Sequence, residues 1–466
     1  MSIEVEKIRL SSLSIVLLIG FALMACDSED STSNQRAGEM AGEAAGEAAG
    51  EAAGETAGET AGETAGETAG EMAGEIAGEM VETTCRGGQS YGFTEDFNAL
   101  ALEGFAPFTA PQVAKLADDR WLIAYLSAAE EGSSDINYIR VMTFDAAFEP
   151  VGEAQLIGRA KGGQFKLHGT SAGAMILWVN QRSELQTNEG VFVQSLDENG
   201  ATSGETIAVS GSFNVRSIDS AWEDGFGGVL VLSEPQKLSA VIFNQTGLGA
   251  DTTVLVEGEN RSPSAAFTGG GWSVAWLSRS SSERTDFDIS VINLNDQGEA
   301  ISDPILLSEA KATGNLSLAY GNGIYSIAWG FPDPTTLDPI PRRIIGMRLL
   351  DETLNEIGRF FVQDGTTDLS LHSVTWVPPS LFGIAWSQSP LGGEGSLLGL
   401  SRINQLGQVL PSVIVEDEAT LFTEVGVSGN ASSMRAFFTA DMSPQPTGLF
   451  SNDTQIMTAP VAPCEE

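Results

Sequence analysis

Residues that could do acid–base, nucleophilic or metal chemistry are unevenly supplied in this chain of 466 residues. Histidine occurs only twice, as His168 and His372, so a histidine-bearing metal site or a Ser-His-Asp triad has little material. Carboxylates number 63, too many for any one pair to stand out as an acid and a base. We therefore expect structural histidines and assign no catalytic residue, metal ligand or cofactor. The sequence leaves an enzyme open and favours a role other than catalysis.

Four arginines are the candidate ligand-binding residues. They lie in two of the longest polar segments between predicted strands, and they are Arg279, Arg284, Arg342 and Arg343. Long loops on a rigid scaffold often carry binding residues. Each such segment joins the second to the third strand of a repeated unit, so we expect one binding face. The segments are residues 127–134, 180–190, 277–286, 330–343 and 387–396.

The elements that would position these loops come from a pattern that recurs seven times, about every 50 residues, from residue 110 to the C-terminus. Its clearest part is a short strand that reads Trp272-Ser-Val-Ala-Trp276, Tyr325-Ser-Ile-Ala-Trp329 and Phe382-Gly-Ile-Ala-Trp386. Four strands fit each unit, with alternating apolar and polar positions in the third. Such a period built from strands is typical of propellers.

Two independent markers keep the same period. The large residue that closes the second strand falls at Tyr125, Trp178, Leu232, Trp276, Trp329, Trp386 and Phe438. The polar residue that closes the third strand falls at Asp145, Asp197, Asn244, Asn295, Asp351, Asn404 and Asn452. The sequence therefore predicts an all-β, seven-bladed β-propeller over residues 85–466, with four antiparallel strands per blade. The eight tryptophans are expected in first or second strands, as core between blades.

The front of the chain has the features of an export signal. Lys7 and Arg9 precede an apolar stretch over residues 10–24, which is too short to favour a spanning helix. It ends in Leu23-Met-Ala-Cys26, which resembles the lipobox of bacterial lipoproteins. That resemblance implies cleavage after residue 25 and acyl chains such as palmitate on Cys26. An ordinary secretory signal cut elsewhere is the alternative.

A low-complexity segment follows the signal. From Ala37 to Met80 the chain consists of eleven tandem copies of Ala-Gly-Glu-X. Glycine at every fourth position costs a helix roughly 1 kcal/mol each time, and the glutamates would repel one another along one face. We expect residues 26–84 to be a disordered acidic tether, with a helical rod as the alternative. Its role would be to hold a globular head away from the bilayer.

Three cysteines are present, and lipidation would use the first of them. Cys85 and Cys464 stand at the first and nearly the last positions of the predicted propeller. Because an exported chain meets oxidising conditions, we expect them to form a disulfide that joins the chain ends. Two unpaired thiols are the alternative.

The charge balance excludes one class of partner. Residues 85–466 hold 20 basic and 46 acidic residues, and the whole chain has a formal net charge of −40. Binding to nucleic acid needs clustered lysine and arginine, so we expect no nucleic-acid partner. Solubility outside the cytoplasm accounts for the acidic surface, although cationic ligands would also suit it.

The repeats resemble those of uncharacterised bacterial lipoproteins with propeller repeats, on the pattern Trp-x-Val-Ala-Trp followed by Ile-x-Val-x-x-Leu-Asn-x-x-Gly. The resemblance implies a propeller and an exported location, and it carries no activity. We expect a monomer anchored by lipid in the cell envelope, most simply at the outer membrane and facing the periplasm or the surface. The main hypothesis is a binding or scaffold module for an envelope protein or glycan. An exported hydrolase or lyase for glycans or lactones, and a structural envelope protein, are the alternatives.

Overall fold

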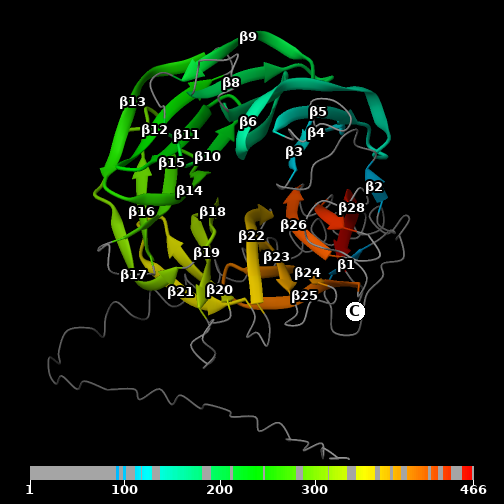
Figure 1. Ribbon diagram of the computed structural model, residues 1–466. Coiled ribbons are helices and arrows are strands. Elements are labelled where there is room, and N and C mark those ends of the chain that lie inside the picture. Colours follow the sequence, from blue (N-terminus) through cyan, green and yellow to red (C-terminus); the bar gives the residue numbers. More distant parts are fainter. Residues whose placement is uncertain are drawn as a thin grey trace, which may run out of the picture. The chain divides into compact units, whose positions relative to one another are not determined.

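The computed structural model describes the strand-bearing part of the chain (Figure 1). The chain divides into two units, residues 1–80 and 81–466, and all described residues belong to the second. Among them the secondary structure is entirely β, with no helix, and so no helix that could cross a membrane. The described residues are 91–93, 98–100, 111–116, 118–127, 137–180, 190–209, 214–244, 247–279, 287–312, 314–332, 343–362, 368–377, 381–389, 396–417, 421–428, 434–441 and 454–463.

Four sheets in the middle of the chain have the expected form of four antiparallel strands in sequence order. The first contains β10 (Ser217–Glu223), β11 (Gly227–Glu234), β12 (Lys237–Asn244) and β13 (Gly247–Glu257). The second contains β14 (Asn260–Phe267), β15 (Trp272–Ser278), β16 (Phe287–Leu294) and β17 (Ile305–Ala312). The third contains β18 (Leu316–Gly321), β19 (Ile324–Pro332), β20 (Arg343–Asp351) and β21 (Glu356–Phe361). The fourth contains β22 (Asp368–Val377), β23 (Leu381–Ser389), β24 (Ser396–Asn404) and β25 (Val409–Asp417).

The sheet before them has seven strands because one strand serves two groups of four. The 21-residue β6 (Pro150–Thr170) pairs with β5 through its first half and with β7 through its second half. The register shifts between Ala160 and Phe165, where the strand passes from one partner to the other. The other strands of this seven-stranded sheet are β3 (Gln112–Lys115), β4 (Trp121–Ser127), β5 (Tyr138–Phe144), β7 (Gly173–Asn180), β8 (Gly190–Leu196) and β9 (Thr202–Val209).

The remaining sheet is built from both ends of the described chain. It contains β26 (Leu421–Ser428), β27 (Met434–Asp441) and β28 (Thr454–Pro463), and two short N-terminal strands pair with the free edge of β28. These are β1 (Tyr91–Phe93) and β2 (Asn98–Leu100). The sequence pattern predicted neither strand, and a disulfide was the only link expected between the chain ends. Backbone hydrogen bonds between the two ends of the chain complete this sheet.

The first strand of each group contacts the first strand of the next. The contacts run from β3 to β6, then through β10, β14, β18 and β22 to β26, and β26 in turn contacts β3. Apolar clusters fill the space between the successive four-stranded sheets from β10 to β25, and the largest buried side chains include Trp272, Trp276 and Trp386. All eight tryptophans lie in first or second strands, as the sequence predicts. The fold is all-β and β-propeller-like.

In the repeated second strand, successive residues face different neighbouring sheets. Trp276 points into the cluster shared with the preceding sheet, and its neighbour Ala275 lies in the cluster shared with the following sheet. Ala275 is fully buried there, and Trp329 of that following sheet belongs to the same cluster. A small residue at this position therefore gives room for the large residue of the next sheet.

A repeated turn follows the third strands. In it an Asp or Asn accepts hydrogen bonds from the backbone N–H groups two and four residues later, as Asn295 does from Gln297 and Glu299, both at 2.9 Å. The fourth residue of this turn has a positive φ, which glycine adopts without strain, and in Gly200, Gly298 and Gly407 it is 78°, 77° and 77°. The same turn is made by Asp145, Asp197, Asp351 and Asn404.

Several expectations fall outside the described residues. These are the signal and tether over residues 1–84, Cys26, Cys85, Cys464, Asn452, Arg284 and Arg342.

Candidate binding site at the loop end of two sheets

Five of the strand connections confirm the predicted placement of the long loops. In each, a second strand ends and a third begins many residues later, as between Ser278 of β15 and Phe287 of β16. By antiparallel pairing, the first strand of the same sheet begins at this end, since Asn260 pairs with Ser278. We call this end of each sheet the loop end. The other four pairs are β4 and β5, β7 and β8, β19 and β20, and β23 and β24.

Three arginines converge on one carboxylate at the loop ends of two adjoining sheets. Arg261 donates from Nη2 and Nε to Oε1 of Glu259, at 2.5 and 3.1 Å. Arg216, which immediately precedes β10, lies 3.6 Å from the same oxygen. Arg279, directly after β15, lies 3.8 Å from Oε2. We call Arg216, Glu259, Arg261 and Arg279 the arginine cluster.

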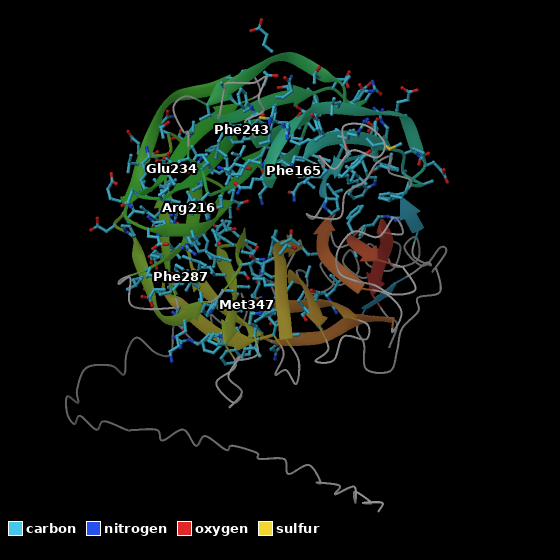
Figure 2. All side chains as sticks on the ribbon, viewed as in Figure 1. Phe165, Arg216, Glu234, Phe243, Phe287 and Met347 are labelled. Carbon is cyan, nitrogen blue, oxygen red and sulfur yellow. The ribbon has the colours of Figure 1, made fainter. Side chains whose placement is uncertain are left out.

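An aromatic ring supports two of these arginines. The guanidinium carbons of Arg261 and Arg279 lie 5.2 and 4.4 Å from the ring centre of Phe287. Phe287 begins β16 and packs into the cluster between its own sheet and the next (Figure 2). Arg261 pairs in register with Leu277, and Arg279 is two residues further along, so strand alternation places both on this face of the sheet. A rigid sheet edge therefore holds the cluster.

The electrostatics of the cluster favour a negative charge at its centre. Hydrogen bonds from Arg261 hold the pKa of the Glu259 carboxyl below its usual value against partial desolvation, and the charges of Arg279 and Arg216 act in the same direction. Nε of Arg279 is buried and has no hydrogen-bond partner among the described residues. Asp288 follows Phe287, and its side chain points to the opposite face of β16. The cluster can thus hold anionic oxygen atoms.

A second polar group lies on the first strands. Lys166 of β6 pairs with Asp219 of β10 at 2.6 Å. The other oxygen of Asp219 accepts the backbone N–H of Ala265 in β14 at 2.9 Å, so one carboxylate links three groups of strands. Its charges are mutually compensated, which gives this group a structural role.

His168 lies beside this group and contacts a serine. Its Nε2 is 2.7 Å from Oγ of Ser220, across the junction between β6 and β10. Burial lowers the pKa of His168 to about 4, Asp219 opposes the shift and Lys166 adds to it. His168 is therefore a neutral imidazole at pH 7, able to accept the hydroxyl proton of Ser220 or to donate to its oxygen. Both histidines lie in first strands of their groups, with His372 in β22.

The inner strands share a joint that the sequence analysis missed. Oγ of Ser264 accepts a hydrogen bond from the backbone N–H of Leu318 at 3.0 Å. Asp219 accepts the N–H of Ala265 in the same way, and Ser317 accepts the N–H of Val374. A signal for it was present. A polar residue stands 12 or 13 positions before the residue that closes the second strand, at Gln112, Lys166, Asp219, Ser264, Ser317 and Ser373.

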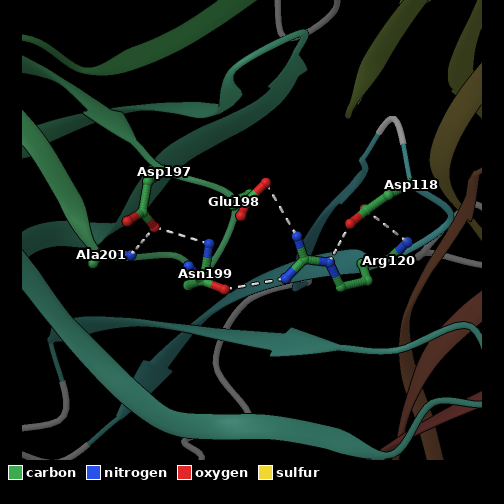
Figure 3. Close-up of polar contacts among 6 residues, drawn as sticks. All are labelled: Asp118, Arg120, Asp197, Glu198, Asn199 and Ala201. Atoms are coloured by element: carbon green, nitrogen blue, oxygen red, sulfur yellow. Dashed lines mark hydrogen bonds and ion pairs between the residues drawn. The ribbon is translucent and has the colours of Figure 1, made fainter.

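A further link joins turns at the end opposite the loops. Arg120, between β3 and β4, donates to Asp118 at 2.5 Å and to Asn199 of the turn after β8 at 3.1 Å, and it lies 3.4 Å from Glu198 (Figure 3). These contacts tie the two halves of the seven-stranded sheet together.

Of the four arginines named from the sequence, only Arg279 is placed in the arginine cluster. Arg343 begins β20 as an exposed residue of the following sheet, and the other two lie outside the described residues. Sequence reasoning missed Arg216, Glu259 and Arg261 because each stands just before or at the start of a first strand, outside the long loops. Their shared position ahead of two successive first strands was the available signal. The described residues contain no group of three or more His, Cys, Asp or Glu placed to hold a metal ion.

Comparisons with known proteins identify no family. No family model matches the chain, and no curated protein matches it. Among solved structures, an ulvan lyase of polysaccharide lyase family PL25 bound to -[GlcA(1-4)Rha3S]- is 10% identical, with a TM-score of 0.48, over 77% of this chain and 93% of that one.

Two further solved structures are similar over most of the chain. A subtype N11 neuraminidase-like protein of A/flat-faced bat/Peru is 11% identical, with a TM-score of 0.37, over 81% of this chain and 95% of that one. A NanB sialidase variant from Streptococcus pneumoniae is 9% identical, with a TM-score of 0.39, over 80% of this chain and 71% of that one. At these values the comparisons carry no conclusion about a ligand or a reaction.

Proposed function

We propose that this protein is a lipid-anchored, seven-bladed β-propeller that binds a ligand in the cell envelope through its loop end. The blade count is supported by the strand groups, because β6 divides into two halves and β1 and β2 supply the outer edge beside β28. Contact between β26 and β3 is what a closed ring requires. Each blade then has four antiparallel strands.

The anchor in this proposal is Cys26, acylated after removal of residues 1–25, with residues 26–84 as the tether to a monomeric propeller. The motif Leu23-Met-Ala-Cys26 and the Ala-Gly-Glu-X repeats support it. A Cys85–Cys464 disulfide fits the same proposal, because Cys464 directly follows β28, whose last residue pairs with Tyr91. An outer-membrane location, facing the periplasm or the surface, follows from the lipoprotein reading.

The observation that carries the binding function is the arginine cluster. Among the described residues, three guanidinium groups and one carboxylate leave an excess of positive charge at a loop end, on a protein whose formal net charge is −40. Structural ion pairs usually balance, and convergent polar groups beside long loops are typical of binding sites.

The full chain, purified in detergent, should capture a specific envelope protein or glycan from arrays of both. Arg279→Ala should reduce that capture at least tenfold, since a charged hydrogen-bonding group contributes about 1.5–3 kcal/mol. Arg359→Ala, which removes an exposed ion pair with Glu356 on the outer strand β21, is the matched control. Equal capture by both variants, or none by the wild type, would contradict the proposal.

The anchor is tested separately. Cys26→Ala should move the protein from the detergent phase to the aqueous phase on phase separation, because the acyl chains would be lost. A variant that stays in the detergent phase would show that another segment anchors the chain. Peptide mass mapping without reduction tests the Cys85–Cys464 bond.

An exported hydrolase or lyase for glycans or lactones is the second candidate function. The contact between His168 and Ser220 favours it, because a neutral imidazole 2.7 Å from a hydroxyl is the arrangement of a general base and its nucleophile. Turnover of any glycan or lactone in a panel, lost at least a hundredfold in Ser220→Ala, would support this candidate. No turnover across the panel would remove it.

A further inference from the structure

We propose that the arginine cluster is a carboxylate-binding site in which Glu259 is an internal ligand that a carboxylate on the binding partner displaces. This inference rests on the proposed binding function and names the chemistry of its ligand.

The donors of the cluster exceed its acceptors. Each guanidinium has five N–H donors, whereas one carboxylate offers about four acceptor positions. Only Arg261 makes short hydrogen bonds to Glu259, both to the same oxygen, and Arg216 and Arg279 lie beyond hydrogen-bond distance. The buried Nε of Arg279 has no partner among the described residues. Glu259 therefore accepts hydrogen bonds from only some of the N–H donors of the three arginines.

The cluster is accessible to a ligand and holds its shape. The side chains of Arg216 and Arg261 are 42% and 46% exposed, whereas that of Arg279 is 19% exposed and forms the floor. Phe287 lies under Arg261 and Arg279, and cation–π attraction keeps both guanidinium groups in place when the central carboxylate leaves. A preorganised site loses little entropy on binding.

A carboxylate is the ligand group that the observations favour. The site already holds one, and guanidinium groups bind carboxylates through paired hydrogen bonds. Glu259 is one-third exposed and precedes β14, so rotation of its side chain can carry it into solvent. Residues 85–466 contain 46 acidic residues, so general attraction of anions is weak and binding must depend on this local convergence. The carboxylate could belong to an acidic glycan or to an acidic peptide.

The test uses the full chain in detergent with four probes: glutarate, oligogalacturonate, a short oligoglutamate and neutral dextran, with binding followed by calorimetry. Glu259→Gln removes the competing charge and should tighten binding of the carboxylate probes about tenfold, the equivalent of losing one charged hydrogen bond. Arg279→Ala should weaken binding at least tenfold, and Arg359→Ala and the dextran should show no effect. Comparison of oligogalacturonate with oligoglutamate distinguishes a glycan from a peptide source.

A gain of affinity in Glu259→Gln cannot result from misfolding, so this variant keeps the test decisive if Arg279→Ala is unstable. Equal affinity in the wild type and Glu259→Gln, an equal loss in Arg279→Ala and Arg359→Ala, or no binding in any variant would overturn the inference. Capture of an envelope partner that is insensitive to Glu259→Gln and Arg279→Ala would retain a binding function and reject this site. Tight binding of the carboxylate probes without capture of any envelope partner would retain this site and reject the proposed binding function.

Discussion

Two neighbouring junctions between sheets share one contact, in which a side-chain oxygen of one sheet accepts a backbone N–H of the next, and they differ in charge. Where the β10–β13 sheet meets β14–β17, Asp219 accepts the N–H of Ala265 at 2.9 Å. Where β14–β17 meets β18–β21, Ser264 accepts the N–H of Leu318 at 3.0 Å. The first junction also carries Lys166 on Asp219 and the arginine cluster at its loop end, whereas Ser264 brings no charge to the second. The position that accepts the neighbouring N–H is therefore shared by both junctions. Charged groups are added at the first junction alone, by an aspartate at that position and by the arginines at the loop end.

The largest expected effect tests what the two junctions share. Trp276→Ala and Trp329→Ala each remove a buried indole from the apolar cluster of one junction, 1% and 3% exposed. Each should lower the free energy of unfolding by about 3–5 kcal/mol, because a large cavity replaces packed atoms. Urea denaturation of the full chain measures both. A loss confined to one of the two would contradict the view that both junctions have equivalent cores.

The next effect separates the two joints. Asp219→Ala leaves the N–H of Ala265 and the half-buried amine of Lys166 without this partner, and should cost about 2–3 kcal/mol of unfolding free energy. Ser264→Ala removes one neutral hydrogen bond and should cost about 1 kcal/mol. Asp219→Asn, which keeps an acceptor for Ala265, should fall between them. Equal costs for Asp219→Ala and Ser264→Ala would show that the charge adds nothing.

A pH effect tests the junction on the other side of β10. The pKa of His168 is lowered to about 4 from 6.5, so between these values the unfolded chain binds a proton that the folded chain does not. Stability is therefore lost as pH falls from 6.5 toward 4, by about 1–3 kcal/mol in total. His168→Gln should remove this part of the pH dependence, measured as the difference between variant and wild type in urea midpoints at pH 7 and pH 4.5. A difference that stays constant with pH would show that His168 titrates normally.

The smallest effect concerns the arginine cluster itself. Since the pKa of the Glu259 carboxyl is lowered, its contribution to stability is present above the usual pKa near 4.5 and is lost as pH falls through the lowered value. Because Glu259 is one-third exposed, solvent screening limits this contribution to under about 1 kcal/mol. Glu259→Gln should thus change the urea midpoint slightly at pH 7, and the change should shrink as pH falls below 4.5. A large loss at pH 7 would indicate a structural salt bridge and would weaken the binding proposal.

The sequence predicted those features that depend on local pattern. Strand two of each unit and the long second-to-third connections follow from period and polarity, and the structure confirms them at β15, β19 and β23 among others. The expected place of the tryptophans, in the core between sheets, is confirmed for Trp276 and Trp329.

Features that depend on contacts between units were missed. Arg216 and Glu259 come together only because two sheets adjoin at their loop ends, and single-chain periodicity does not report distances across such a junction. The pairing of β1 and β2 with β28 was missed because both strands are three residues long and lie outside the repeat. His168 was expected to be structural, and its contact with Ser220 became evident only from the packing of β6 against β10.

The pairing of the two chain ends has a kinetic consequence. Tyr91 in β1 pairs with Pro463 in β28, so almost the entire head lies between these partners. Bringing together ends so far apart costs about 5 kcal/mol of loop-closure entropy, and contacts of such high order form late in folding. Until β1 and β2 arrive, the edge of β28 is unpaired and open to the same strands of a second chain. Slow refolding at high protein concentration should therefore yield dimers that have exchanged their N-terminal strands.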